Sequence, residues 1–483
     1  MPARTAEDLW SAAELERREA EVRIRPGSAF MTSPEGGVDA VLTSYFNSAP
    51  FLRLADATQE SYLKDYRLFF DFLWRRSRSW SEATRDDVED YEDWRRRAPT
   101  NPRRVGGSKW MRELAALNRL YQWAVATGQI AANPVATRVR VTRDGQMVQT
   151  LDAAAHDVVT ADVKWLTPRA WSRWRDVGLL GLDASGLPDG TFRGRNGDRN
   201  AAYADLLFDS GLRRTEGASL LVLELPAVAE GSRYQRGRLA TAVAKNGSGR
   251  PFYVTTATLR RIGAYLATSR ADAVRAAQEA GRYDRVPGKL LVEKTGLAPV
   301  PVLRWVDEAT GTAGEGRLDR LPVPLRERLF VRGPDGLEPA WLWVGEDGMP
   351  FQGHSWEAVF SAASKRCRRL LGPGAPFCTP HMARHSFALT MLVALQHVLD
   401  TRFGLDAEQR RDFAALYGNP WRMVKDLLGH RSEDTTRNIY LAPVQDVQIR
   451  SLLEGDLAAG AEFLQAVAAA SGRVQDVAPS GGR

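Results

Sequence analysis

The sequence of 483 residues has little cysteine and no long apolar run. Its two cysteines, Cys367 and Cys378, lack the spacing partners of a zinc site and cannot supply a disulfide framework. No stretch reaches the continuous apolar length of a membrane span, and the charged residues 1–26 lack the apolar core of a signal peptide. These absences predict a soluble, cytoplasmic protein without a membrane partner.

Charge of neither sign dominates the sequence. The 66 lysines and arginines exceed the 59 aspartates and glutamates enough to give a formal net charge of +7. This balance permits a polyanionic partner without requiring one. Basic residues gather within helical, aromatic-rich stretches, where they suit either a nucleic-acid surface or an ordinary solvated helix. The two runs are Arg95, Arg96, Arg97, Arg103 and Arg104, and Lys365, Arg366, Arg368 and Arg369.

The length of the chain predicts two domains with appendages. Residues 1–37 are predicted to form a charged N-terminal arm, and residues 38–141 a small helical domain. In the helical domain, apolar side chains recur at steps of three and four residues, which is typical of a buried helix face. They are Tyr62, Tyr66, Phe69, Phe70, Leu73 and Trp74, and then Leu114, Leu117, Leu120, Tyr121 and Trp123.

The second half of the chain mixes helical patterns with a small β-hairpin or sheet. A polar linker over 142–162 leads to a predicted mixed α+β domain over 163–447, so the expected fold is mainly α. Stretches near 186–200, 282–339 and 401–420 lack sustained periodicity and are predicted to be surface insertions. Residues 448–483 are predicted to form a tail helix and a disordered end. The apolar stripe of that helix comprises Leu452, Leu453, Leu457, Phe463, Leu464 and Val467.

The first chemical motif is a glycine turn followed by a helix. Gly211 precedes Arg213, and Glu216 follows three residues later on the same helix face. The helix macrodipole disfavours an arginine at a helix N-terminus, so one placed there suggests a nearby anion such as phosphate. Taken alone, the pair is more often an ordinary surface ion pair.

The second motif is a predicted hairpin around Lys245. Two β-prone runs flank an Asn246-Gly247 turn within residues 242–254, which predicts Lys245 at the end of the first strand. A lysine there could reach into a groove. It could equally be an edge-strand charge that prevents aggregation.

The third motif combines a histidine and an arginine. Thr379 and Pro380 favour a helix start, and the three-residue step brings His381 and Arg384 onto one face. Together these side chains can donate hydrogen bonds to the non-bridging oxygens of a phosphate. A zinc site is disfavoured, because the glutamate expected between His381 and His385 in a zinc-protease helix is missing.

The fourth motif ends a helix and begins another. Gly429 predicts a helix end, His430 follows in the turn, and a threonine-capped helix then presents Tyr440. A tyrosine hydroxyl needs nearby cations to become a nucleophile at neutral pH. An isolated helical tyrosine is usually a packing residue. The hypothesis that Tyr440 is a nucleophile therefore depends on the cationic motifs that precede it.

These four motifs, in this order, resemble those of the tyrosine recombinases, the superfamily that includes phage integrases and Xer resolvases. The resemblance extends to the helical first domain, which ends at Asn133-Pro134, and so covers roughly residues 38–447. It implies a helical core DNA-binding domain and a mixed α+β catalytic domain. The catalytic residues that it implies are Arg213, Lys245, His381, Arg384, His430 and Tyr440, with Glu216 in support.

The resemblance also implies a reaction: DNA strand breakage and rejoining. Arg213, Arg384 and His430 would hold the scissile phosphate while Tyr440 forms a 3′-phosphotyrosyl bond. Lys245 would protonate the leaving 5′-oxygen, and His381 would accept the tyrosine proton or help to hold the phosphate. No cofactor or metal is expected. The partner would be double-stranded DNA, with a homotetramer on two sites and a monomer or weak oligomer without DNA.

The sequence departs from the family pattern in spacing. The gap from His430 to Tyr440 is one residue longer than the commonest form, and residues 401–420 lengthen the chain before Gly429. Two related activities stay open, a type IB topoisomerase that relaxes DNA and an inactive DNA-binding relative. An unrelated helical scaffold would need four ordered motifs by chance. The tail helix could pack on its own domain or on a neighbouring copy.

Overall fold

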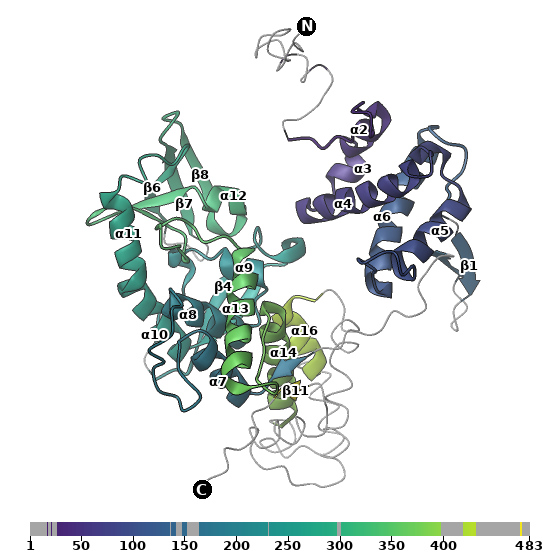
Figure 1. The fold of residues 1–483 in the computed structure, drawn as a ribbon. Coiled ribbons are helices and arrows are strands. Elements are labelled where there is room, and N and C mark those ends of the chain that lie inside the picture. Colours follow the sequence, from purple (N-terminus) through teal and green to yellow (C-terminus); the bar gives the residue numbers. More distant parts are fainter. Residues whose placement is uncertain are drawn as a thin grey trace. The chain divides into compact units, whose positions relative to one another are not determined.

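The computed structural model describes residues 27–135, 137–141, 147–151, 164–229, 231–296, 301–397, 419–430 and 474–475, together with Arg17 and Glu21. The chain divides into two compact units, Met1–Thr160 and Ala161–Arg483. Each unit has its own buried hydrophobic core. Figure 1 shows the helices and strands of both.

The first unit is built from helices and ends in two short strands. Strands β1 (Thr137–Val141) and β2 (Met147–Leu151) pair in antiparallel fashion, and β2 falls within the stretch that the sequence assigns to a linker. The helical elements before them are α2 (Ala40–Phe46), α3 (Ala49–Leu52), α4 (Asp56–Trp74), η2 (Trp80–Glu82), α5 (Arg85–Arg96) and α6 (Gly107–Ala126).

The predicted apolar stripes are the core of this unit. On α4, the side chains of Tyr66, Phe69 and Phe70 are fully buried, as three-and-four spacing requires of a helix with one face inside. The Tyr66 hydroxyl donates a hydrogen bond to the backbone oxygen of Ala116 on α6, at 2.9 Å. The stripe on α6 packs against α4, so the predicted helical domain is confirmed.

Part of the first basic run is interior. Arg95 is 6% exposed, and its guanidinium forms an ion pair with buried Glu113 at 3.1 Å. Asp65 on α4, also buried, accepts hydrogen bonds from Lys109 and Arg112 on α6. These pairs join the helices, because a buried charge is stable only beside its counter-charge.

The second unit combines helices with small sheets, and the predicted mainly helical fold is confirmed. Its helices are α7 (Pro168–Gly178), α8 (Gly197–Ser210), α9 (Arg214–Ala218), η3 (Val222–Glu224), η4 (Lys245–Gly247), α10 (Thr256–Ala267), α11 (Ser269–Glu279), η5 (Leu318–Arg320), α12 (Val323–Arg326), α13 (Ser355–Leu371), α14 (Pro380–His397) and α16 (Pro420–Leu428). Its strands are β3 (Trp165–Leu166), β4 (Tyr234–Leu239), β5 (Arg250–Thr255), β6 (Leu290–Thr295), β7 (Val302–Asp307), β8 (Ala313–Arg317), β9 (Leu329–Gly333), β10 (Gly336–Pro339) and β11 (Val474–Gln475).

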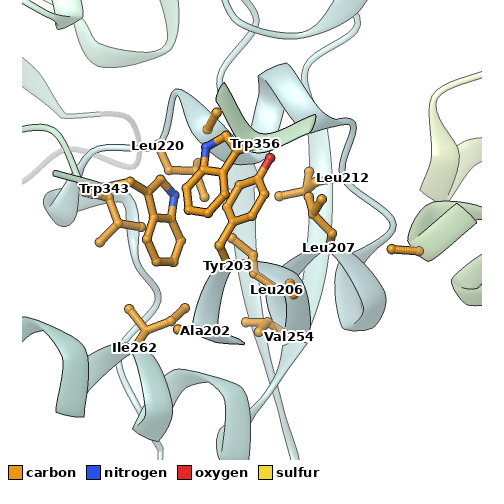
Figure 2. Close-up of a cluster of buried hydrophobic side chains, with 14 of the residues drawn as sticks. Ala202, Tyr203, Leu206, Leu207, Leu212, Leu220, Val254, Ile262, Trp343 and Trp356 are labelled. Carbon is orange, nitrogen blue, oxygen red and sulfur yellow. The ribbon is translucent and has the colours of Figure 1, made fainter. Parts of the chain in front are cut away.

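Helix α8 lies at the centre of this unit's core. Its Tyr203 is fully buried and stacks on Trp356 of α13, with ring centroids 3.5 Å apart, while Trp343 meets it edge-on (Figure 2). The Trp343 indole nitrogen donates a hydrogen bond to the backbone oxygen of Gly217 in α9, at 2.9 Å. Aromatic packing therefore fixes α9, which carries the first chemical motif, to the core.

The stretch predicted as a surface insertion, residues 282–339, contains regular structure. It contains a five-stranded sheet in the order β10-β9-β6-β7-β8, with β6 and β9 parallel and the other neighbours antiparallel. The strands have only four to six residues each, so their sequence lacks a sustained period. Both Gly314 and Gly316 of β8 lie against the Trp305 ring of β7. A side chain at either position would clash with that ring.

Arg326 of α12 attaches this sheet to the rest of the unit. Its side chain is fully buried and forms an ion pair with Glu224 at 2.6 Å. The same guanidinium donates hydrogen bonds to the backbone oxygens of Ser219, Leu318 and Leu321. One side chain thus connects the end of η3, the start of η5 and α12.

At the end of the predicted insertion near 186–200, helix α8 begins at Gly197. A buried arginine stabilises the loop that precedes α8. Arg366 of α13 is 7% exposed and donates hydrogen bonds to Asp189 and to the backbone oxygens of Val177 and Leu182. The second basic run therefore divides: Arg366 is structural, while Lys365, Arg368 and Arg369 are exposed.

The predicted insertion at 401–420 and the tail helix at 448–483 lie largely outside the described residues. Of the tail, Val474–Gln475 is described, and it pairs in parallel with β3. None of the helices within the described ranges has the length and apolar character needed to cross a lipid bilayer.

Replacing Arg326 by alanine should lower the free energy of unfolding of the second unit by about 3–5 kcal/mol, because Glu224 would remain buried without its cation. Chemical denaturation measures this change. The matched control is Arg304→Ala, which removes an exposed arginine–glutamate pair of the same sheet, with Glu315 as partner. The control should change stability little. Equal losses in the two variants would contradict this role of Arg326.

Candidate active site

The turn between α8 and α9 positions Arg213 and Glu216. Helix α8 ends at Gly211, whose φ of +64° is left-handed and whose Cα lies against the Phe387 ring, so no side chain fits there. Arg213 then caps α9. Its backbone N–H donates to Glu216 Oε2 and its guanidinium to Glu216 Oε1, each at 2.9 Å. The predicted same-face pair is present, and Arg213 stays 22% exposed on the side chain.

Glu216 is shared with a second arginine that sequence reasoning missed. Arg250 of β5 is 5% exposed, and it donates to both carboxylate oxygens of Glu216, at 3.2 and 2.6 Å. Burial alone would raise the pKa of Glu216, but the hydrogen bonds and charges of Arg250 and Arg213 outweigh it and lower the pKa to about 2. Glu216 is therefore ionised at neutral pH and binds both arginines.

Arg250 also reaches the fourth motif. Its Nε donates to the backbone oxygen of Leu427 at 2.9 Å, and its guanidinium lies so close to Gly429 that a side chain there would touch it. The available signal was strand alternation: in β5 the inward positions are Arg250, Phe252 and Val254, which are all buried. An arginine among inward apolar residues predicts a buried acidic partner.

The hairpin around Lys245 is present, but its first strand was predicted in the wrong place. Strand β4 is Tyr234–Leu239, six or more residues before Lys245, and it pairs with β5. Lys245 begins the tight η4 turn, where Asn246 adopts a φ of +61°. The Lys245 backbone N–H donates to Glu216 Oε1 at 3.4 Å, and its side chain is exposed. The connection between the strands, rather than a strand end, thus carries the lysine.

Helix α14 carries the third motif as predicted. Thr379 Oγ1 accepts a hydrogen bond from the Met382 N–H at 3.2 Å, which caps the helix start. Arg384 is 2% exposed, and its two terminal nitrogens donate to the backbone oxygens of Gly211, at 2.5 Å, and Leu428, at 2.6 Å. Arg384 therefore connects the first motif to the fourth through their backbone.

The fourth motif ends α16. Gly429 adopts a left-handed φ of +65° as the helix cap, and the His430 N–H donates to the backbone oxygen of Lys425 at 3.0 Å. Arg213 donates to the Gly429 backbone oxygen at 3.4 Å. Tyr440 lies outside the described residues, so its predicted position is not tested.

Three histidines at this site are held in their neutral form. Desolvation, together with the positive charges of Arg384, Arg213 and Arg250, lowers the pKa of His430 to about 3. The pKa of His381 is lowered by desolvation, Arg384, Arg213 and Lys245, in that order. Buried His385 meets the His381 ring edge-on at 4.1 Å, and desolvation with nearby cations lowers its pKa to about 3.

A cavity of about 1060 Å³ opens beside these residues. Its lining includes Arg213, His381 and Arg384, together with Lys365 and Arg368 of α13. Cys378 lines the cavity but is buried, and burial raises the pKa of its thiol well above the usual range. Among the charged side chains that line the cavity, arginines and lysine outnumber the single acid, Glu357, which suits an anionic ligand.

The structure thus brings together six of the seven predicted residues: Arg213, Glu216, Lys245, His381, Arg384 and His430. Within the described part of the chain, no group of three or more histidine, cysteine, aspartate or glutamate side chains could hold a metal ion. Cys367 and Cys378 are both free thiols.

Residues 52–128 match the family model of the phage integrase N-terminal SAM-like domain. The chain therefore contains this domain, and the predicted resemblance to phage integrases is confirmed over it. These residues span α4 to α6 and the core between them. A search of curated protein sequences gives no match.

Several solved structures are similar to the chain. An integrase of the Tn1549 transposon, in complex with a circular intermediate DNA, is 12% identical with a TM-score of 0.41, covering 80% of this chain and 90% of that one. The XerH recombinase bound to a palindromic difH substrate is 12% identical, with a TM-score of 0.41 and coverages of 92% and 85%. A lambda integrase dimer bound to a core site is 11% identical, with a TM-score of 0.38 and coverages of 88% and 93%.

Glu216→Gln should lower stability at neutral pH and also flatten the acid limb of the stability curve. The pKa of Glu216 is about 2 in the folded protein, against an ordinary value of 4.5 in the unfolded chain. Between these two pH values the unfolded chain therefore binds more protons. Wild-type stability should thus fall, as pH decreases from about 4.5 to about 2, by on the order of 3 kcal/mol through this group.

Denaturation curves over this pH range measure the difference between the variant and the wild type. The matched control is Glu357→Gln, which alters an exposed carboxylate that pairs with Arg214 at 3.4 Å near the same cavity. Glu357→Gln should keep the wild-type fall in stability between pH 4.5 and about 2. If Glu357→Gln flattens that fall as much as Glu216→Gln does, the Glu216 network does not govern stability in acid.

Proposed function

We propose that the chain is a site-specific DNA recombinase of the tyrosine recombinase type, which cleaves and rejoins duplex DNA through a 3′-phosphotyrosyl intermediate. The observation that carries the proposal is the convergence of four distant segments, around residues 211–216, 245–250, 381–385 and 427–430. These are the segments in which the sequence motifs lie. The phage integrase domain at residues 52–128 supports the same activity.

The charges of the site favour a bound phosphate. Arg213, Arg250, Arg384 and Lys245 carry four positive charges, and Glu216 returns one negative charge, so these five side chains leave three positive charges in excess. Arg213 is partly exposed beside the cavity, and Arg384 lies in its wall. Preorganised cations of this kind stabilise the charge that develops on a phosphate during transfer.

The chemistry then follows from the groups available. The Tyr440 hydroxyl attacks the phosphorus, a tyrosine–phosphate bond forms, and the bond to the 5′-oxygen breaks. Lys245 gives its proton to that oxygen. His381 is neutral because its pKa is lowered, and it accepts the tyrosine proton or holds the phosphate. The His430 N–H donates a hydrogen bond to the phosphate. The phosphoester is conserved, so rejoining needs no ATP.

The partner of this reaction is double-stranded DNA in the cytoplasm. The integrase domain would bind the duplex together with the second unit, and two sites cut on both strands require four copies of the chain. The apolar stripe predicted at 452–467 offers one way to link the copies. A type IB topoisomerase, which uses closely similar chemistry, would instead relax plasmid DNA without a specific site.

If Tyr440 is the nucleophile, a nicked DNA site incubated with the protein should yield a covalent adduct that survives denaturant. Tyr440→Phe should abolish the adduct while leaving DNA binding intact, because only the attacking oxygen is lost. Denaturing gel electrophoresis of labelled DNA measures both. Tyr417→Phe is the matched control and should retain the adduct. An adduct that persists in Tyr440→Phe but disappears in Tyr417→Phe would assign the reaction to the other tyrosine.

A further inference from the structure

The outward side of the β4–β5 hairpin carries exposed arginines and tyrosines that have no role in the proposed chemistry. Strand alternation places Tyr234, Arg236 and Arg238 of β4 outward, and all three are exposed. Tyr253 of β5 lies directly opposite Arg236 and is also exposed. We call these four residues, with the adjacent exposed Arg233, the hairpin outer face.

The arginines of this face are not neutralised by neighbouring acids. In the described ranges, no carboxylate lies within ion-pairing distance of Arg233, Arg236 or Arg238. Arg238 borders a small cavity with two acids whose charges are already committed. Glu224 pairs with Arg326 at 2.6 Å, and Asp319 pairs with Arg317 at 3.0 Å. The three arginines therefore form a patch of uncompensated positive charge.

The tyrosines distinguish this face from an ordinary charged strand. Tyr234 is 49% exposed and Tyr253 is 40% exposed, whereas most large apolar side chains of the unit are buried. The Arg233 guanidinium lies 5.8 Å from the centre of the Tyr234 ring. Lysine or arginine alone would suffice to prevent edge-to-edge aggregation. Exposed tyrosines interleaved with arginines instead suit a polyanion, to which the hydroxyls donate hydrogen bonds.

We propose that the hairpin outer face binds the sugar–phosphate backbone of duplex DNA beside the cleavage position. The inference rests on the proposed function, because the η4 turn that carries Lys245 joins these same two strands. Arg236 and Arg238 are two residues apart, about 7 Å along the strand, so they meet different phosphate groups. Their contact with the backbone adds affinity without adding sequence specificity.

The test compares DNA binding by the full chain and by the double variant Arg236→Ala, Arg238→Ala over a series of salt concentrations. The probe is a mixed-sequence duplex, since backbone contacts carry no sequence information. The variant should bind about tenfold more weakly, and the slope of log affinity against log salt should fall by about 2, or about one per lost phosphate contact.

The control variant is Arg275→Ala, Arg304→Ala, which removes the same net charge from exposed positions that pair with Asp272 and Glu315. It should leave the salt slope unchanged. Tyr234→Phe combined with Tyr253→Phe should also weaken duplex binding, because it removes the hydroxyls that donate hydrogen bonds to the backbone.

Each alternative result overturns the inference. A double arginine variant with wild-type affinity and slope shows that the face is merely solvated. A changed oligomeric state with an unchanged salt slope makes it an interface between copies of the chain. Loss of binding to single strands alone assigns it to unpaired DNA. A wild-type chain that forms no covalent adduct and binds no duplex would instead overturn the proposed function, whatever the hairpin variants do.

Discussion

The active-site half of the second unit depends on one buried carboxylate. Glu216 accepts hydrogen bonds from Arg213 at the start of α9, from Arg250 on β5 and from the backbone of Lys245 in the hairpin turn. Arg250 extends this network to the backbone of Leu427. A buried carboxylate is tolerated only with such partners, and removing Glu216 would leave Arg250 buried without its counter-charge. The Glu216 network thus fixes the geometry of both arginines, and Arg213, which is partly exposed, stays available to a ligand.

The same arrangement determines protonation. Because several arginines surround a partly desolvated site, protonating a histidine there is unfavourable, and the pKa values of His381, His385 and His430 are all lowered. A bound phosphate would partly reverse this effect, because its negative charge stabilises the imidazolium form. The neutral histidines of the free protein are therefore suited to gain a proton during a reaction that brings an anion into the cavity.

The sequence predicted the elements whose signals are local. The stripe on α4, the Thr379 cap of α14 and the glycine ends of α8 and α16 follow from side-chain spacing and backbone conformation, and each is present.

The features that the sequence did not predict depend on contacts between distant residues. The pairing of Arg250 with Glu216 joins residues 34 apart, and the five-stranded sheet is held by Trp305 against glycines and by buried Arg326. The position of β4 was wrong because an Asn-Gly turn predicted a two-residue hairpin, whereas the connection here also forms a hydrogen bond from Ala242 to Asp319. The predicted Tyr440 helix and tail helix lie outside the described residues.

The central claim is that Arg213 and Arg384 act on the charge of the scissile phosphate. The most direct measurement is the rate of adduct formation on two duplex substrates, one with a normal phosphate and one with a neutral methylphosphonate at the cleavage position. The account predicts that Arg384→Ala reduces the rate by several orders of magnitude on the phosphate but far less on the neutral substrate, because no non-bridging charge remains for the arginine to stabilise. An equal loss on both substrates would contradict the claim and assign Arg384 to holding the backbone of Gly211 and Leu428 alone.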